Sequence, residues 1–399
     1  MAGTRITATA RSKALAAVAV LALGAGVALL ARVDGLGPAT GPDRTMRWLG
    51  ATTTPTSVQV ARASEVLAQR PIDGRAYRVL AMAQFAAGES EAGDTLLAIA
   101  NRRWPRDPLT RAMSAERAFA RGDAKTALEH IDAWMRIEPG TRREVLALLM
   151  PQLRDARVRD ALVARADLDP PWRGALFDAL RAPETPAADA DTLVLALAHA
   201  SGISGEEALT RVVLLDRQGE YAHAREIWRG HLSTVEAGRA DAVYDGGFEQ
   251  PGVAGGYGWR FSSQPGIDIH YDETTPRAGL STLRIGFGGR AEPFGGLSQH
   301  LALQPGRYRL RASVHDNVET TRPFEWRVRC RDEGRDIGRL VLRREGSAVP
   351  MWRTHETTFE VPPGCMGQTL ALVHAARSLA ERRLSGTLSV DDVGIFLIR

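Results

Sequence analysis

The sequence predicts a multidomain protein with an N-terminal transmembrane helix, an all-α solenoid in the first half and an all-β sandwich in the second. Three observations predict this arrangement. An uncharged apolar run fills residues 14–31, prolines recur at intervals of 34 residues in a helical region, and from about Asp241 short alternating runs are broken by Gly and Pro. A chain of 399 residues is also too long for one compact core.

The charge pattern argues against a nucleic-acid partner. The net charge is only +4, and Lys occurs only at Lys13 and Lys125. Arginine and acidic residues are mixed along the chain, without the one-sided basic stripe that phosphate binding requires. The hydrophobic fraction of 44% and charged fraction of 25% are those of ordinary globular domains.

Residues 1–32 are predicted to form a cytoplasmic tip and a membrane anchor. The apolar run of residues 14–31 is about as long as the shortest helices that span a bilayer. Positive charges precede it, so the N-terminus stays in the cytoplasm and the rest of the chain is exported. We therefore expect an inner-membrane anchor with the bulk of the chain in the periplasm. The flanking cations are Arg5, Arg11, Lys13 and Arg32.

An alternative is that the same segment is a signal peptide. Gly26 and Ala28 supply small residues at suitable offsets for cleavage after Ala28. Cleavage would release the chain into the periplasm. We expect an uncleaved anchor because the run is longer than most signal-peptide cores. Residues 33–56, rich in Gly, Pro and Thr, then form a linker.

Residues 57–235 show a 34-residue internal period. Pro71, Pro105 and Pro139 are evenly spaced (105 − 71 = 34 and 139 − 105 = 34), and Gly88 and Gly122 keep the same interval (122 − 88 = 34). Gly permits positive φ in the turn between two helices, and Pro ends the second helix. This pattern resembles tetratricopeptide (TPR) repeats.

The resemblance extends to apolar positions in three units, and it implies a concave surface that binds a protein partner. Gln84 and Gly93 depart from the pattern, and residues 141–186 have helical period without a clear signature. The matching residues are Tyr77, Leu80, Ala81, Leu97 and Ala100, then Ala115, Ala118, Ala127 and Ile131, then Ala208, Val212, Leu215, Gly219, Ala224 and Trp228.

Residues 241–399 are predicted to form an antiparallel β-sandwich. Apolar residues alternate with Arg and Ser over residues 308–314, and with Glu and Arg over residues 324–330. Each strand therefore has one buried and one solvated face. Similar alternation occurs at residues 283–287 and 297–303.

The order of motifs in this half resembles the galactose-binding-like jelly rolls of carbohydrate-binding modules. An acidic opening motif at residues 245–249 precedes Gly258-Trp259, and the chain ends with Val390-Asp391-Asp392-Val393-Gly394-Ile395. The resemblance spans nearly all of residues 245–399. It implies a sandwich that contacts polysaccharide, as in bacterial exopolysaccharide-associated envelope proteins.

The same resemblance implies a structural calcium ion, although no cofactor is required. The implied ligands are Asp245, Glu249 and Asp392, completed by backbone carbonyls. In the alternative interpretation, Glu249 and Asp391 only accept hydrogen bonds from turn amides. Asp245 stands where the family more often has Asn.

Sugar binding needs exposed aromatic rings. Tyr257 and Tyr271 are the candidate ligand-binding residues because they fall in predicted loops. The three tryptophans of this half, Trp259, Trp326 and Trp352, are assigned to the core.

Cys330 and Cys365 are the only cysteines, and both lie in the predicted sandwich. In an exported protein, two cysteines in one β-domain favour a disulfide over a metal site. We predict a Cys330–Cys365 bridge that stabilises the sandwich by roughly 3–4 kcal/mol.

No catalytic residues are assigned, and we expect a non-enzymatic scaffold. The nine histidines are scattered, and no nucleophile elbow or phosphate-binding loop is present. The expected role is a membrane-anchored scaffold in exopolysaccharide assembly or export. One alternative is a pure protein–protein adaptor. Another is a glycan-processing enzyme that uses a carboxylate such as Glu292 or Asp316.

Overall fold

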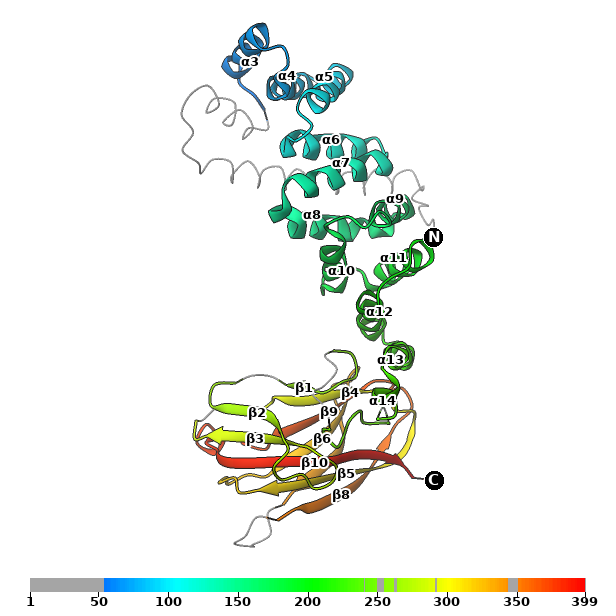
Figure 1. The fold of residues 1–399 in the computed structure, drawn as a ribbon, viewed down its shortest axis with the longest axis vertical. Coiled ribbons are helices and arrows are strands. Elements are labelled where there is room, and N and C mark those ends of the chain that lie inside the picture. The colour runs from blue at the N-terminus through cyan, green and yellow to red at the C-terminus, as the bar shows by residue number, and fades with distance from the viewer. Residues whose placement is uncertain are drawn as a thin grey trace, which may run out of the picture. The chain divides into compact units, whose positions relative to one another are not determined.

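The computed structural model describes residues 54–239, 241–249, 255–261, 264–290, 293–343 and 351–398. The chain divides into two compact units, Met1–Ser204 and Gly205–Arg399. The described part of the first unit is helical, and the second contains helices followed by two antiparallel sheets (Figure 1). The predicted anchor lies outside the described residues. Within them, no helix has the length and apolar character needed to cross a bilayer.

The first unit is a succession of short helices joined by tight turns. Most of them bury one face, as expected of amphipathic helices in a layered array. They are α3 (Ser57–Gln69), α4 (Gly74–Ala86), α5 (Ser90–Arg103), α6 (Pro108–Ala120), α7 (Ala124–Ile137), α8 (Arg142–Leu149), α9 (Ala156–Ala166), α10 (Arg173–Arg181) and α11 (Ala187–Ala200), with 3-10 turns η3 (Pro139–Thr141) and η4 (Met150–Arg154).

The prolines and glycines of the 34-residue period lie at helix ends and turns, as predicted. Pro71, Pro105 and Pro139 each follow the last residue of a helix by two positions. Gly88 and Gly122 adopt φ values of 84° and 75° between paired helices. The helix–turn–helix units are therefore confirmed, whereas membership of the tetratricopeptide family stays a prediction.

The departure at Gly93 has a packing reason. A Cβ at this position of α5 would overlap the ring of Phe85 from α4. Glycine therefore lets an aromatic side chain lie directly on the backbone of the partner helix. A buried ion pair, with Arg78 Nε 2.8 Å from the Asp107 carboxylate, then ties α4 to the start of α6.

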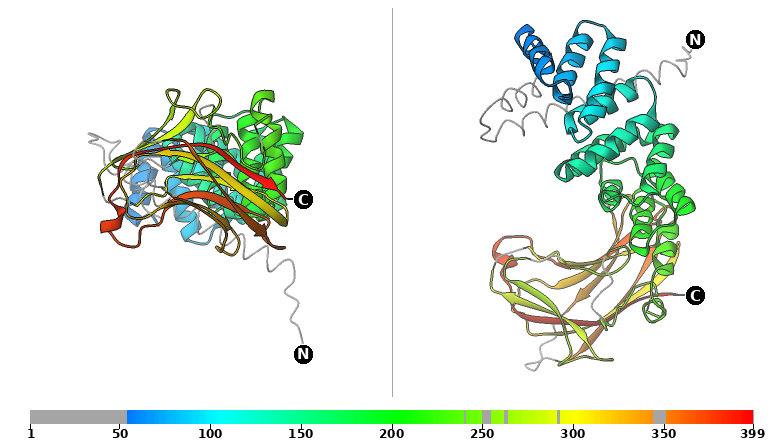
Figure 2. Two further views of the ribbon diagram at one scale, coloured as in Figure 1. Left: turned by 90° about the horizontal axis from the view of Figure 1, so that it is seen from below. Right: turned by 45° about the horizontal axis from the view of Figure 1, so that its top comes forward.

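The second unit is a β-sandwich of two five-stranded sheets that pack face to face (Figure 2). One sheet has the strand order β1-β4-β9-β6-β7 and the other β2-β3-β10-β5-β8. The strands are β1 (Arg260–Phe261), β2 (Ile267–Asp272), β3 (Thr282–Gly288), β4 (Leu297–Leu301), β5 (Gly306–Asp316), β6 (Phe324–Cys330), β7 (Asp336–Leu342), β8 (Arg353–Val361), β9 (Gln368–His374) and β10 (Ser385–Leu397), with the 3-10 turn η5 (Ala380–Arg382).

The core of the sandwich confirms the predicted alternation. Along β5 the residues Tyr308, Leu310, Ala312 and Val314 are buried, and the intervening arginines point outward. The inward residues of both sheets form one apolar cluster. The second half of the chain is therefore a β-sandwich, as its alternation predicts.

Three helices precede the strands within the second unit: α12 (Gly205–Arg217), α13 (Tyr221–Gly230) and α14 (Thr234–Ala237). The last helix ends at Ala237, near the point where the composition of the sequence changes, and the first strand begins at Arg260. The division between compact units falls earlier, after Ser204. The physical reason is that Trp228 of α13 shares an apolar cluster with Tyr244 and Tyr257, which follow the helices.

Candidate functional site

A groove lies on the β-sandwich beside the second half of β10. This strand pairs with β3 only as far as Val390, but it pairs with β5 as far as Leu397. Beyond Val390, the chain around Gly246 lies next to β10, and the amide of Val393 donates a hydrogen bond of 2.8 Å to the carbonyl of Gly246. The missing strand neighbour therefore leaves room for a groove.

Gly246 is required for this close approach. A Cβ at this position would overlap the carbonyl oxygen of Val393. Only glycine therefore allows the segment to lie directly against the strand. The Asp245-Gly246-Gly247 motif, which carries part of the sequence resemblance, thus builds one wall of the groove.

The groove encloses about 720 Å³, a size typical of small-molecule sites. One wall comes from residues 238–239 and 241–249, and the other from Arg311 of β5 and residues 392–397 of β10. Both signs of charge meet there. The charged lining residues are Arg239, Asp241, Asp245, Glu249, Arg311 and Asp392. The three predicted calcium ligands therefore all line this one groove.

The side chain of Asp245 stabilises the backbone of residues 245–249 and does not reach into the open part of the groove. Its side chain is buried, and its Oδ1 accepts a hydrogen bond of 3.1 Å from the amide of Glu249. The guanidinium of Arg239 lies 3.9 Å from the same oxygen. Asp245 also has a φ of 45°. Aspartate tolerates this left-handed conformation better than most side chains, which fits the turn at this position.

Glu249 and Asp391 hold a neighbouring turn by its amides. The Glu249 carboxylate accepts from Leu280 at 2.9 Å. Asp391 accepts from Arg277 at 3.0 Å and from Ala278 at 3.3 Å. Burial, together with the nearby Glu249 carboxylate, raises the pKa of Asp391 to about 6. This arrangement is the turn-amide alternative stated from the sequence.

The residues present do not assemble the predicted calcium ligand set. Asp392, in a left-handed conformation with φ of 54°, forms an ion pair with Arg277. Among the described residues, no three His, Cys, Asp or Glu side chains are grouped so as to hold a metal ion. Calcium binding stays a prediction of the family resemblance, and we derive no role for the ion.

An aromatic ring flanked by guanidinium groups lies at one end of the groove. Phe396 is 40% exposed. The guanidinium carbons of Arg309 and Arg311 lie 5.9 and 5.1 Å from its ring centre. The Arg311 Nε is buried and has no hydrogen-bond partner in the described part of the chain. The groove thus combines a partly exposed apolar ring with a guanidinium group beside it.

The prediction that Tyr257 offers its ring to a ligand is wrong for this structure. Tyr257 is only 2% exposed, and its hydroxyl donates a hydrogen bond of 2.7 Å to the carbonyl of Tyr221. Its ring packs beside Trp228 of α13 and against His300 of β4. The helices α12 and α13 bury this ring, and the sequence alone did not predict that contact. Burial raises the pKa of Tyr257 above its usual value.

Tyr271 lies on β2 and does not line the groove. It is half-buried, and its ring meets the exposed ring of Phe261 edge to face at 6.1 Å. Its role in ligand binding stays a prediction. The structure confirms Trp259 and Trp326 as core residues, while Trp352 is half-buried beside His315 at the edge of the sheet.

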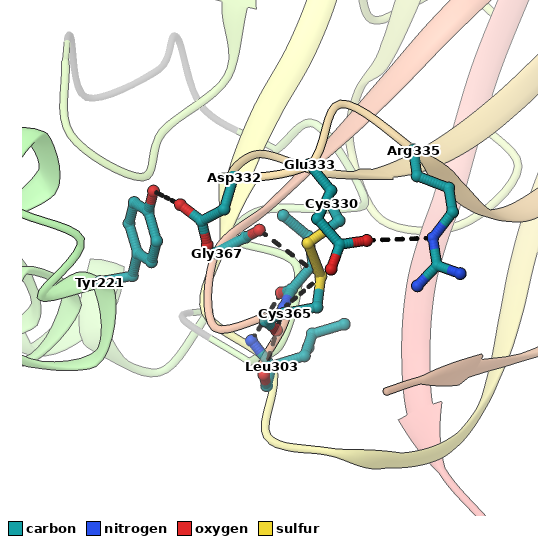
Figure 3. Close-up of a disulfide and its surroundings, with 9 residues drawn as sticks. Tyr221, Leu303, Cys330, Asp332, Glu333, Arg335, Cys365 and Gly367 are labelled. Atoms are coloured by element: carbon teal, nitrogen blue, oxygen red, sulfur yellow. Dashed lines mark hydrogen bonds and ion pairs between the residues drawn. A yellow bond between two sulfur atoms is a disulfide. The ribbon is translucent and has the colours of Figure 1, made fainter. Parts of the chain in front are cut away.

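The Cys330–Cys365 disulfide is present as predicted, with a Cα–Cα distance of 5.6 Å. It joins the end of β6 to the loop that precedes β9, and Figure 3 shows it next to Asp332 and Gly367. The bridge lies away from the residues that line the groove.

Sequence analysis did not identify Phe396 or Arg311. A signal was nevertheless present, because the run Phe396-Leu397-Ile398 breaks the alternation expected of a strand with one wet face. All three side chains are exposed to a substantial degree. Three consecutive exposed apolar residues at a strand end mark a surface for contact.

No protein-family model and no curated protein matches the chain. Several structural neighbours are carbohydrate-binding modules, and another is the enzymatically active domain of the bacteriophage CBA120 tailspike protein 4. One is TmCBM61 in complex with β-1,4-galactotriose, at 17% identity over 40% of this chain and 100% of that chain, with a TM-score of 0.29. Another is the CBM22-1 xylan-binding domain of Paenibacillus barcinonensis Xyn10C, at 15% identity over 40% and 96%, with a TM-score of 0.28. At these identities the likeness concerns the fold of the sandwich alone.

Proposed function

We propose that the chain is a non-catalytic glycan-binding scaffold whose β-sandwich binds sugar in the groove beside β10. The observation that carries the proposal is the pairing of the half-exposed Phe396 ring with the Arg311 guanidinium in a groove of about 720 Å³. An apolar ring can lie against the C–H face of a pyranose, and an adjacent donor can orient its hydroxyls.

The remaining lining groups suit hydroxyl recognition. Carboxylates such as Asp392 only accept hydrogen bonds, and guanidinium groups only donate them. A sugar hydroxyl both donates and accepts hydrogen bonds. A groove lined by carboxylates and guanidinium groups can therefore pair with it in either role. The opposed charges of Asp392 and Arg311 in one groove therefore favour a polyhydroxylated ligand over a purely apolar one.

The proposal includes a membrane anchor at residues 14–31, a periplasmic location and a role in exopolysaccharide assembly or export. The cations before the apolar run support export of the rest of the chain. The Cys330–Cys365 disulfide supports an oxidising compartment. The helical array would bind a protein partner through its repeats, as stacked helical pairs offer extended surfaces for recognition.

The proposal assigns no catalysis to the sandwich. Asp391 has the raised pKa expected of a general acid, but its side chain is only 1% exposed and accepts hydrogen bonds from backbone amides. A substrate therefore has no direct access to it. Turnover that disappears in Asp316→Asn or Glu292→Gln would favour the glycan-processing alternative; Glu292 lies outside the described residues.

The test is affinity electrophoresis of the full chain in gels that contain single polysaccharides. We expect one glycan to retard the protein. Phe396→Ala should weaken that binding about tenfold, which corresponds to about 1.4 kcal/mol of lost ring contact. Arg311→Gln should weaken it by a similar factor or more, through a lost charge-assisted hydrogen bond.

The matched control is Arg383→Gln, which changes an exposed arginine that does not line the groove. It should bind as the unaltered chain does. Retardation that survives both groove substitutions would place the glycan elsewhere. Absence of retardation by every polysaccharide would favour the pure protein–protein adaptor.

A further inference from the structure

The helical hairpin, defined as α12 and α13, is packed onto the sandwich by an apolar cluster of its own. Trp228 of the hairpin meets Tyr244 edge to face at 5.1 Å and Tyr257 at 6.0 Å. A Cβ at Gly256 would overlap the Trp228 ring, so the loop backbone itself receives the indole. This cluster is separate from the core between the two sheets.

Two polar contacts fasten the other side of the hairpin. Arg331 donates to both oxygens of Asp216 in α12, at 2.5 and 2.7 Å. The hydroxyl of Tyr221 in α13 donates to Asp332 at 2.6 Å. Burial and this carboxylate raise the pKa of Tyr221 to about 12, so the hydroxyl remains a donor at neutral pH.

The sandwich residues that meet Asp216 and Tyr221 lie on two loops. We call these the docking loops and define them as residues 331–334 and residues 362–367. The first follows β6 and supplies Arg331 and Asp332. The second precedes β9 and supplies Gly367. A Cβ at Gly367 would overlap the Tyr221 ring, so this ring lies directly on the loop backbone.

The disulfide joins the two docking loops. Cys330 immediately precedes Arg331, and Cys365 lies two residues before Gly367. Figure 3 shows the bridge beside Asp332 and Gly367, with Tyr221 reaching toward them. Apart from the bridge, the amide of Arg331 donates to the carbonyl of Gly367 at 3.0 Å. The disulfide is thus a covalent tie between the two segments on which the hairpin rests, in addition to the β6–β9 ladder that pairs Cys330 with Gln368.

We propose that the disulfide is a redox-sensitive latch that controls the docking of the helical hairpin on the sandwich. A dithiol reductant supplies two electrons and two protons, the Sγ–Sγ bond breaks, Cys330 and Cys365 become thiols, and the reductant is oxidised to a disulfide. The second docking loop then gains conformational freedom, Tyr221 loses its fixed contact surface, and the hairpin detaches more readily.

Amide hydrogen exchange of the full chain, before and after reduction with dithiothreitol, tests the latch. At labelling times short enough that β5 and β10 stay protected in both states, amides of α12 and α13 should exchange at least about tenfold faster after reduction, because local openings need not involve the whole unit. An equal acceleration in all four elements, or none in the hairpin, would overturn the proposal.

A second variant keeps the test independent of overall stability. Asp216→Ala combined with Tyr221→Phe removes both polar contacts but leaves the disulfide intact. The hairpin of this variant should already exchange fast, and reduction should add less than about a twofold acceleration, since coupled changes are not additive. An acceleration equal to that of the unaltered chain would contradict the latch.

The matched control is Arg335→Gln. It removes the ion pair between Arg335 and Glu333, at 3.2 Å, from the same turn between β6 and β7. In Figure 3, Arg335 lies on the opposite side of the disulfide from Tyr221. This variant should respond to reduction as the unaltered chain does, and a loss of the response would show that any change in the turn suffices.

Discussion

Arg331 and Asp216, 115 positions apart in the sequence, form a bidentate ion pair with donor–acceptor distances of 2.5 and 2.7 Å. Desolvation of the guanidinium opposes the pair, but the hydrogen bonds and charge of Asp216 outweigh it and raise the pKa of Arg331. The pair joins α12 to the turn after β6. Together with the apolar cluster around Trp228, it joins the last helical pair to the strands in one compact unit.

Asp216→Ala should destabilise the second unit by about 2–3 kcal/mol, because the mostly buried guanidinium of Arg331 loses its partner. Chemical denaturation followed by tryptophan fluorescence would measure it, since Trp228 packs between the same helices and the sandwich. Asp178→Asn is the control. Its ion pair with Arg181 is exposed, so a loss of less than about 1 kcal/mol is expected. Equal losses in both variants would refute the argument.

Gly279→Ala should displace Glu249 from the turn that it holds. The new Cβ would overlap the Glu249 carboxylate, at a residue with φ of 70°. Gly289→Ala is the matched control, because its φ is 77° but its surroundings are open. The control should cost about 1 kcal/mol of backbone strain, and Gly279→Ala clearly more. Thermal unfolding of both variants decides, and equal melting temperatures would contradict the account.

The raised pKa of Asp391 makes stability depend on pH. Its pKa of about 6 in the folded state lies above the ordinary value of 3.8, so the folded state binds its proton more tightly. The resulting stabilisation is complete below about pH 4 and is lost as pH rises through about 6.

Asp391→Asn tests this dependence because the amide oxygen can still accept from the turn amides. The stability of the variant relative to the unaltered chain should rise by about 2–3 kcal/mol between pH 4 and pH 7. Unfolding free energies at both pH values provide the measurement. A difference that does not vary with pH would mean that Asp391 titrates normally.

Removal of the disulfide should lower the stability of the second unit. The cysteines are separated by 35 positions, and loop-closure entropy for that separation predicts a loss of about 4 kcal/mol in Cys330→Ser with Cys365→Ser. Denaturation in urea would measure it. A loss below about 1 kcal/mol would indicate that the strands around β6 fix both loops without the bridge.

Local signals explain why much of the fold was predictable. Pro71 and Gly88 mark helix ends through their own backbone restrictions. The alternation over residues 324–330 identifies a strand and its buried face before any partner is known. The disulfide followed from the restriction of both cysteines, Cys330 and Cys365, to one domain that the sequence predicts to be exported.

The candidate site was harder to predict because it depends on contacts between distant segments. From the sequence, Tyr257 is expected to be an exposed loop residue. In the structure its ring packs beside Trp228, which belongs to an earlier helix. The groove exists because residues 241–249, rather than β3, lie beside the end of β10. No local pattern around Arg311 or Phe396 reports that replacement.

The central claim is that the sandwich binds glycan at the groove beside β10. Its most direct test is the retardation of the full chain in polysaccharide gels, compared between the unaltered chain, Phe396→Ala and the Arg383→Gln control. The account predicts retardation by one glycan, a loss of about tenfold in affinity on Phe396→Ala, and no change for the control. Undiminished retardation of Phe396→Ala, or no retardation of the unaltered chain by any glycan, would contradict it.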